Sequence, residues 1–244
     1  MKLENKVIIV TGSSKGIGKE IAILLAKNGA KLVINYSNSE AEAESVVQTI
    51  IKNGGNAISI KADVSKKDQV SQLFDKTITN FGKIDVLVNN AGVMATKKLK
   101  DSTEDDFNKH FDVNVKGLFN TLKEADSKLE DNGKIINISS STVKFMFPTY
   151  SLYSASKAAV EQMTRVFSKE IGRGISVNAV APGPTETDLF LTGKTPEFIE
   201  KLSAMNAFNR LAQPIDIANV VLFFASDESK WISGQVIGAN GAMV

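Results

Sequence analysis

Residues 153 to 157 read Tyr-Ser-Ala-Ser-Lys and place a phenol and an ammonium four residues apart. The pattern around them predicts a helix from Tyr153 to Ile171, so Tyr153 and Lys157 share one face of it. A phenol with a pKa of about 10 is a weak acid–base catalyst at neutral pH, but an adjacent ammonium stabilises the phenolate and lowers that pKa. The pair is therefore a candidate acid–base group, and Ser140 adds a hydroxyl just after the apolar run Ile135–Ile138.

Few other residues are suited to acid–base, nucleophilic or metal chemistry. The chain has no cysteine and one histidine, His110, so we exclude a thiolate nucleophile and expect no metal site. A net charge of +2, with no basic run denser than 96–100, predicts no nucleic-acid partner. The apolar run that begins at Val7 is too short for a signal peptide or a membrane span, and we expect a cytoplasmic protein with no membrane partner.

A glycine-rich loop, Thr11–Gly18, follows the first apolar run and opens a helical pattern. Its glycines allow a tight turn and a close approach to a pyrophosphate, whose charge then lies against the first amides of the helix. This arrangement predicts a dinucleotide site. The loop also matches the G-x-S-x-G pattern of hydrolases, with Ser14 as nucleophile. That alternative is disfavoured because it needs a histidine late in the chain, whereas His110 lies mid-chain in a helical pattern.

The end of the second apolar run indicates which dinucleotide binds. A site for NAD usually has an acidic residue there, which holds the ribose 2′-hydroxyl. Here the chain reads Asn35-Tyr36-Ser37, with no acid before Glu40. Lys15, in the glycine loop, is placed to face a 2′-phosphate, and such a charge-assisted contact favours the phosphorylated cofactor about ten- to hundredfold. We therefore predict NADPH.

The apolar runs predict the fold. They alternate with stretches of helical period, and no linker or repeat divides the chain. This pattern predicts a single-domain α/β fold over residues 1–244, a Rossmann-type doubly wound parallel sheet of about seven strands with helices on both faces. The site then lies at the carboxyl ends of the strands. The predicted strands are Val7–Val10, Lys31–Asn35, Ala57–Ile60, Ile84–Val88, Ile135–Ile138, Ile175–Val180 and Gln235–Ile237.

Taken in order, these motifs resemble the short-chain dehydrogenase/reductase family over nearly the whole chain. Besides the glycine loop and the Tyr-x-x-x-Lys pair, the sequence has 89–92 (Asn-Asn-Ala-Gly), Asp63, Asn114 and 182–187 (Pro-Gly-Pro-Thr-Glu-Thr) at matching positions. The resemblance implies that Ser140 bonds the substrate carbonyl and that Tyr153 protonates it. It also implies that Lys157 lowers the tyrosine pKa and holds the nicotinamide ribose, and that Asn114 holds a water that relays protons.

The resemblance and the glycine loop together give the expected site. Asp63 would meet the adenine, Asn90 and Gly92 would flank the cofactor, and 182–187 would face the nicotinamide. The expected catalytic residues are Asn114, Ser140, Tyr153 and Lys157. The expected cofactor-binding residues are Gly12, Ser14, Lys15, Gly16, Ile17, Gly18, Asn35, Tyr36, Ser37, Asp63, Val64, Asn90, Ala91, Gly92, Tyr153, Lys157, Pro182, Gly183, Thr185 and Thr187.

The segments that flank a nicotinamide usually shape the substrate pocket. Here they supply Phe145, Phe147, Leu189 and Phe190, which suit an apolar ketone or aldehyde or, equally, core packing. The segment at about 185–210, with a helical pattern from Pro196 to about Asn209, resembles the family's mobile lid. The end of the chain, 237–244, resembles its subunit-contact tail, and the family expectation is a homotetramer.

Two other functions stay open at this point. One is a non-catalytic NADP-binding regulator, which normally would have lost part of the Ser–Tyr–Lys set. The other is a 3-oxoacyl-carrier-protein reductase, which needs basic residues to dock its acidic carrier. Arg173 is one candidate, and Lys97, Lys98 and Lys134 could add to it, but 129–133 (Leu-Glu-Asp-Asn-Gly) places two acids at the second docking position. We therefore favour reduction of free carbonyl compounds.

Overall fold

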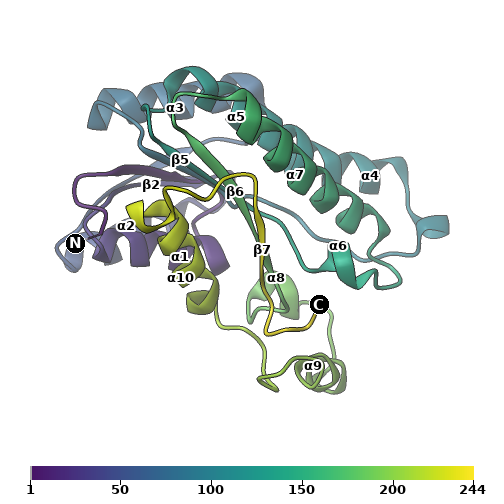
Figure 1. The fold of residues 1–244 in the computed structure, drawn as a ribbon. Coiled ribbons are helices and arrows are strands. Elements are labelled where there is room, and N and C mark those ends of the chain that lie inside the picture. The colour runs from purple at the N-terminus through teal and green to yellow at the C-terminus, as the bar shows by residue number, and fades with distance from the viewer. Residues whose placement is uncertain (1) are drawn as a thin grey trace.

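The computed structural model describes residues 2–244, and the strands in this range form one seven-stranded parallel sheet (Figure 1). The strand order is β3-β2-β1-β4-β5-β6-β7, so the order reverses beside β1, where β4 follows on its other side. The prediction of a doubly wound parallel sheet is confirmed. The strands are β1 (Val7–Val10), β2 (Lys31–Tyr36), β3 (Asn56–Lys61), β4 (Val86–Asn89), β5 (Lys134–Ile138), β6 (Ser176–Pro182) and β7 (Val236–Ala239).

Helices cover both faces of the sheet (Figure 1). Successive side chains of a strand point to opposite faces, so Ile8 and Val10 enter one core and Ile9 the other. Burial on both faces explains why the strands read as continuous apolar runs. One layer holds α1 (Gly16–Lys27), α2 (Glu40–Lys52) and α10 (Pro214–Ala225), and the other holds α3 (Lys67–Phe81), α4 (Glu104–Phe111), α5 (Gly117–Lys128) and α7 (Ser151–Glu170).

Three short helices lie toward the carboxyl ends of the strands, and they are α6 (Thr142–Phe145), α8 (Asp188–Leu191) and α9 (Pro196–Ser203). Single-turn 3₁₀ helices occur at Leu99–Asp101 and Asp227–Ser229. A π-helical segment, Asp112–Lys116, joins α4 to α5. Within the described part of the chain, every helix is too short or too polar to cross a membrane.

The predicted elements differ from the observed ones mainly at their ends. The α7 helix begins at Ser151, two residues before the predicted start. The helix predicted from Pro196 to about Asn209 ends at Ser203, which corrects the prediction. The cause is Asn206, whose amide nitrogen donates to the carbonyls of Ser203 and Arg210, because such side-chain bonds replace helical ones and favour a turn.

The amino ends of β1, β4 and β5 are joined by Asp85, which is 5% exposed. Its carboxylate accepts a 2.8 Å hydrogen bond from the Val7 amide and pairs with the half-exposed Lys6 and Lys83 at 3.3 and 3.1 Å. The Asp85 carbonyl also accepts from the Lys134 amide. This anchor lies at the edge of the sheet opposite the carboxyl ends of the strands.

Asp85→Ala should therefore destabilise the fold and leave the arrangement at the carboxyl ends of the strands unchanged. Loss of the carboxylate leaves the buried Val7 amide without an acceptor, which costs about 1–3 kcal/mol. Urea unfolding of the variant and the unmodified chain measures this difference. An unchanged unfolding midpoint would show that the anchor is dispensable.

Candidate active site

A cavity of about 530 Å³ opens at the carboxyl ends of the strands, where the sequence places the site. Nearly all the predicted residues line it, from the glycine loop to Thr187. Two predicted residues, Tyr36 and Asn114, do not. Residues that line the cavity and that the sequence did not single out as site residues include Asn38, Met94, Lys109, Val113, Ser139, Tyr150, Leu202 and Met243.

The glycine loop forms one wall of the cavity. Gly12 and Gly16 have φ of 60° and 58°, a left-handed conformation that side chains disfavour. A Cβ at Gly18 would overlap the amide nitrogen of Asn90, which itself donates to the carbonyls of Thr11 and Gly12 at 2.9 Å. The loop is thus held open by Asn90, and its backbone can approach a ligand closely. The first turn of α1 receives no side-chain cap from residues 2–244, so its amides can bind an anion.

At the end of β2, the position of one predicted cofactor-binding residue, Tyr36, differs from the prediction. The Asn35 side chain is 1% exposed, accepts from the Gly12 amide at 3.2 Å and donates to the carbonyls of Ile60 and Ala62. Asn35 therefore fixes the glycine loop to β3. The Tyr36 side chain does not line the cavity but packs in the core with α1 and α2, and its hydroxyl bonds Glu40. The cavity is lined instead by Ser37 and Asn38.

Strand β5 and helix α7 bring Ser140, Tyr153 and Lys157 together. The Lys157 ammonium, in a side chain that is 5% exposed, donates a 2.7 Å hydrogen bond to the Ile138 carbonyl. Its nitrogen lies 5.9 Å from the centre of the Tyr153 ring. Ser140 follows β5, and its oxygen accepts from the amide and the hydroxyl of Thr142 at 3.3 and 3.0 Å. The Ser140 hydroxyl also interacts with the Tyr153 phenol. The three groups thus face one end of the cavity, as the sequence predicts.

The protonation of the two α7 groups follows from their surroundings. Removal from water raises the pKa of Tyr153 to about 12, although the hydrogen bond with Ser140 lowers it. Burial also lowers the pKa of Lys157 to about 8. We expected Lys157 to lower the tyrosine pKa, but in this structure desolvation is the largest influence on that pKa and raises it. Tyr153 is consequently a protonated phenol at neutral pH.

Asn114 lies in the π-helical segment, away from the main cavity. Its amide oxygen accepts from the Val93 amide at 2.8 Å, and its nitrogen donates to the Val93 carbonyl and the Ser156 hydroxyl. The side chain therefore joins the loop after β4 to α7. A second, much smaller cavity of about 10 Å³ is lined by Asn114, Asn89 and Lys157, and it shares Lys157 with the first.

His110 is 2% exposed and has a structural role that the sequence did not reveal. One ring nitrogen, Nε2, accepts from the Ala95 amide at 3.1 Å, and Nδ1 lies 2.7 Å from the Asp106 carbonyl. The carbonyl can only accept, so Nδ1 carries the proton. Because both nitrogens are occupied, His110 is not available as a base for Ser14, which argues against the hydrolase.

Aromatic rings form the wall of the cavity beside Tyr153. Phe145 and Phe147 stack with ring centres 4.5 Å apart, Phe147 lies 6.0 Å from Tyr150, and Tyr150 lies 6.4 Å from Tyr153. All four line the cavity, as do Leu189 and Phe190. The segment includes Met146 and Thr149 at φ of 53° and 75°. Such strain in non-glycine residues is typical of functional sites.

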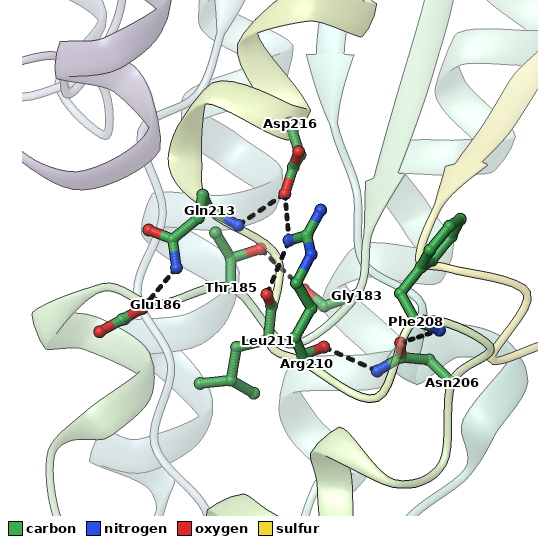
Figure 2. A network of polar contacts seen from close by, with 9 residues as sticks. All are labelled: Gly183, Thr185, Glu186, Asn206, Phe208, Arg210, Leu211, Gln213 and Asp216. Atoms are coloured by element: carbon green, nitrogen blue, oxygen red, sulfur yellow. Dashed lines mark hydrogen bonds and ion pairs between the residues drawn. The ribbon is translucent and has the colours of Figure 1, made fainter.

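The segment carrying α8 and α9 is joined to the fold at both of its ends (Figure 2). Glu186 donates its amide to the Ala212 carbonyl, and its carboxylate accepts from the Gln213 side chain. Arg210 pairs with Asp216 at 2.6 Å, and Asp216 also accepts from the Gln213 amide. The two ends of the segment therefore lie together beside the start of α10, and the residues between the two ends lie over the cavity.

Comparison with known proteins agrees with this site. A family model described as enoyl-(acyl carrier protein) reductase matches residues 12–243. A short-chain type dehydrogenase/reductase of Picea abies is 44% identical, and the alignment covers 99% of this chain and 93% of that protein. The chain belongs to the short-chain dehydrogenase/reductase family.

Two further members of this family bear on the cofactor and the reaction. An NADPH-dependent aldehyde reductase-like protein of Arabidopsis thaliana is 41% identical over 100% of this chain and 96% of its own length. The crystal structure of the angucycline C-6 ketoreductase LanV with bound NADP has a TM-score of 0.94 at 38% identity, and the match covers 99% of this chain and 96% of that one. The short-chain dehydrogenase/reductase family is one of oxidoreductases, so this chain is an enzyme of that class.

Proposed function

We propose that this protein is an NADPH-dependent reductase that converts a free ketone or aldehyde with an apolar flank to an alcohol. The observation that carries the proposal is the Tyr153 phenol, protonated at neutral pH and hydrogen-bonded to Ser140 at the end of a large cavity. A proton donor of this kind suits carbonyl reduction, in which the oxygen must gain a proton. The activities for which the aldehyde reductase-like protein and the ketoreductase LanV are named are consistent with it.

The chain's own residues support this mechanism. NADPH, when bound, would supply the hydride. The open glycine loop and the uncapped start of α1 fit its pyrophosphate, and Lys157 fits the ribose beside the nicotinamide. The Ser140 hydroxyl would hold the substrate oxygen, and the Tyr153 hydroxyl would transfer its proton to that oxygen as it gains charge. Lys157, as an ammonium below about pH 8, would stabilise the phenolate that remains.

The proton that Tyr153 gives up must be replaced. The second cavity is about the size that one water needs, and it touches both Asn114 and Lys157. Asn89, which also lines it, has a buried amide oxygen without a partner within residues 2–244. These features support a relay water beside Lys157, with Asn114 holding the wall of its site.

Three observations support NADPH over NADH. Strand β2 ends without an acid, and the cavity wall after it is formed by Ser37 and Asn38, which can donate to a phosphate. Lys15 also lines the cavity and is exposed, so its ammonium can reach a 2′-phosphate. The LanV ketoreductase structure contains NADP.

A free substrate is favoured over one bound to a carrier protein because two of the four basic docking candidates, Arg173 and Lys97, are paired within the chain. The Arg173 guanidinium donates to the Leu129 carbonyl at 2.7 Å and pairs with Asp131 at 3.2 Å, so it caps α5 instead of facing a partner. Lys97 pairs with Asp106 at 2.8 Å. The aromatic wall beside Tyr153 suits an apolar group on the carbonyl compound.

We also propose a homotetramer in the cytoplasm. Support comes from exposed apolar side chains in two places, which would each be covered by another copy. The first group of these side chains is Ile215, Phe223, Trp231, Ile237 and Val244, with Trp231 97% exposed, and the second is Phe107, Phe119 and Val166. Sedimentation at the mass of four chains would agree with a tetramer, and sedimentation at the mass of one chain would refute it.

Tyr153→Phe should lower kcat for carbonyl reduction by at least about a hundredfold, since it removes only the proton donor. Binding of NADPH should change little, because the ring and Lys157 remain. Steady-state kinetics and a fluorescence titration with NADPH measure the two effects. Turnover close to that of the unmodified enzyme would refute the mechanism.

The cofactor preference should be at least about tenfold in kcat/KM for NADPH over NADH. Lys15→Ala and Ser37→Asp should each reduce it, the first by removing a positive charge and the second by placing a negative one in the cavity wall. Lys19→Ala is the matched control, because Lys19 is one turn further along α1 and does not line the cavity. Equal use of both cofactors by the unmodified enzyme would contradict the assignment.

Free aryl ketones should have a higher kcat/KM than acetoacetyl-carrier protein. Phe147→Ala should raise KM for an aryl ketone about tenfold, the expected loss of one aromatic contact. The control is Phe208→Ala, which removes an exposed ring that does not line the cavity. A kcat/KM for the carrier substrate about tenfold or more above every free carbonyl would instead identify a carrier-protein reductase.

A further inference from the structure

Inside the sheet, the Asn137 side-chain amide of β5 donates to the Thr164 hydroxyl of α7 at 2.9 Å. Three more polar links join α7 to residues 138–140 at the end of the strand, and only two of these involve the reacting groups. Ser140 bonds Tyr153, and the Ile138 carbonyl accepts from Lys157. The residue between them, Ser139, donates its hydroxyl to the carboxylate of Glu161 at 3.0 Å. Three consecutive residues at the end of the strand are thus each tied to one face of the helix.

Glu161 continues the row that Tyr153 and Lys157 begin. The three residues are spaced four apart, so they follow one another on a single face of α7. Glu161 is 5% exposed and lines neither the main cavity nor the smaller one. It therefore cannot touch substrate or cofactor, and any effect on the reaction must pass through Ser139.

The surroundings of Glu161 are poorly suited to a purely stabilising role. Its second oxygen pairs with Arg165 at 3.1 Å, but the Arg165 side chain is 44% exposed, so the buried carboxylate has one hydroxyl and one largely hydrated cation as partners. A buried charge of this kind is often no more stabilising than an apolar residue of the same size. A carboxylate here is better explained by the direction it imposes on its partner.

The partner is constrained closely. The Ser139 hydroxyl is 2% exposed, and its other contact, the Lys157 carbonyl, lies at the longer distance of 3.4 Å. The Ser139 amide donates to the Val180 carbonyl of β6 at 2.7 Å. With the backbone tied to β6 and the side chain tied to α7, Ser139 sets where the next residue, Ser140, stands relative to Tyr153.

We propose that Glu161 is a positioning residue for the reaction, which holds Ser140 against Tyr153 by accepting the Ser139 hydroxyl. The inference rests on the proposed function, because it takes Ser140 and Tyr153 as the groups that act on the carbonyl. Displacing one member of such a pair by a fraction of an ångström lowers kcat more than it changes binding. The ion pair with the Arg165 guanidinium is secondary, because Arg165 contacts only the Glu161 oxygen that does not accept from Ser139.

The test compares Glu161→Leu with Glu161→Gln. The leucine has a similar volume and no acceptor, whereas the glutamine keeps an oxygen for Ser139 and loses only the charge. Glu161→Leu should lower kcat about tenfold or more, with KM for the ketone and Kd for NADPH within about twofold, and Glu161→Gln should restore most of kcat. Ser139→Ala should match the leucine variant, and the double variant should lose no more, because both break the same link.

Asp85→Ala is the matched control, a carboxylate of equal burial at the opposite edge of the sheet. It should lose stability and keep kcat. A readout that needs no activity is amide hydrogen exchange in peptides covering 137–142, which should quicken in Glu161→Leu and Ser139→Ala but not in Asp85→Ala. Absence of carbonyl reduction by the unmodified protein would refute the proposed function. Unchanged exchange in a folded Glu161→Leu variant, or unchanged kcat where the unmodified enzyme is active, would overturn the positioning role.

Discussion

The buried hydrogen bond from the Lys157 ammonium to the Ile138 carbonyl sets the position of helix α7 on strand β5. The ammonium is largely removed from water, so leaving it without an acceptor would cost far more than an ordinary hydrogen bond contributes. Tyr153 lies one helical turn before Lys157, and Ser140 lies two residues after Ile138. The distance between the phenol and the hydroxyl therefore follows from a contact that neither of them makes.

Burial at this contact also sets the protonation of the two groups in the proposed mechanism. It keeps Tyr153 protonated at neutral pH, and it brings the pKa of Lys157 down to about 8. A protonated phenol can give a proton to a reduced carbonyl at once, whereas oxidation of an alcohol would require the phenolate first. In the proposed mechanism the free protein is therefore in the protonation state that reduction needs, and the ammonium would act when the phenolate forms.

Much of this could be predicted from sequence because strand and helix periods are local properties. The continuous apolar runs predicted a two-sided parallel sheet, and the order of the motifs predicted the site at its carboxyl edge. The burial of the Tyr36 side chain in the core, away from the cavity, could not be predicted, since it depends on packing against α1 and α2. The same applies to the π-helical turn at Asn114 and to the early end of α9, where Asn206 forms a turn instead. The pKa of Tyr153 depends on how much water the assembled cavity excludes, which no spacing in the sequence records.

The protonation state of Tyr153 can be measured directly, because the chain has only three tyrosines. Ultraviolet titration of the unliganded protein from neutral pH to about pH 10, compared with Tyr153→Phe, isolates the absorbance of this one phenol, whose unperturbed pKa is about 10. The account predicts that the two titrations coincide over this range, because Tyr153 stays protonated. An absorbance step of one phenolate that is lost in Tyr153→Phe and has its midpoint below about pH 9 would contradict it.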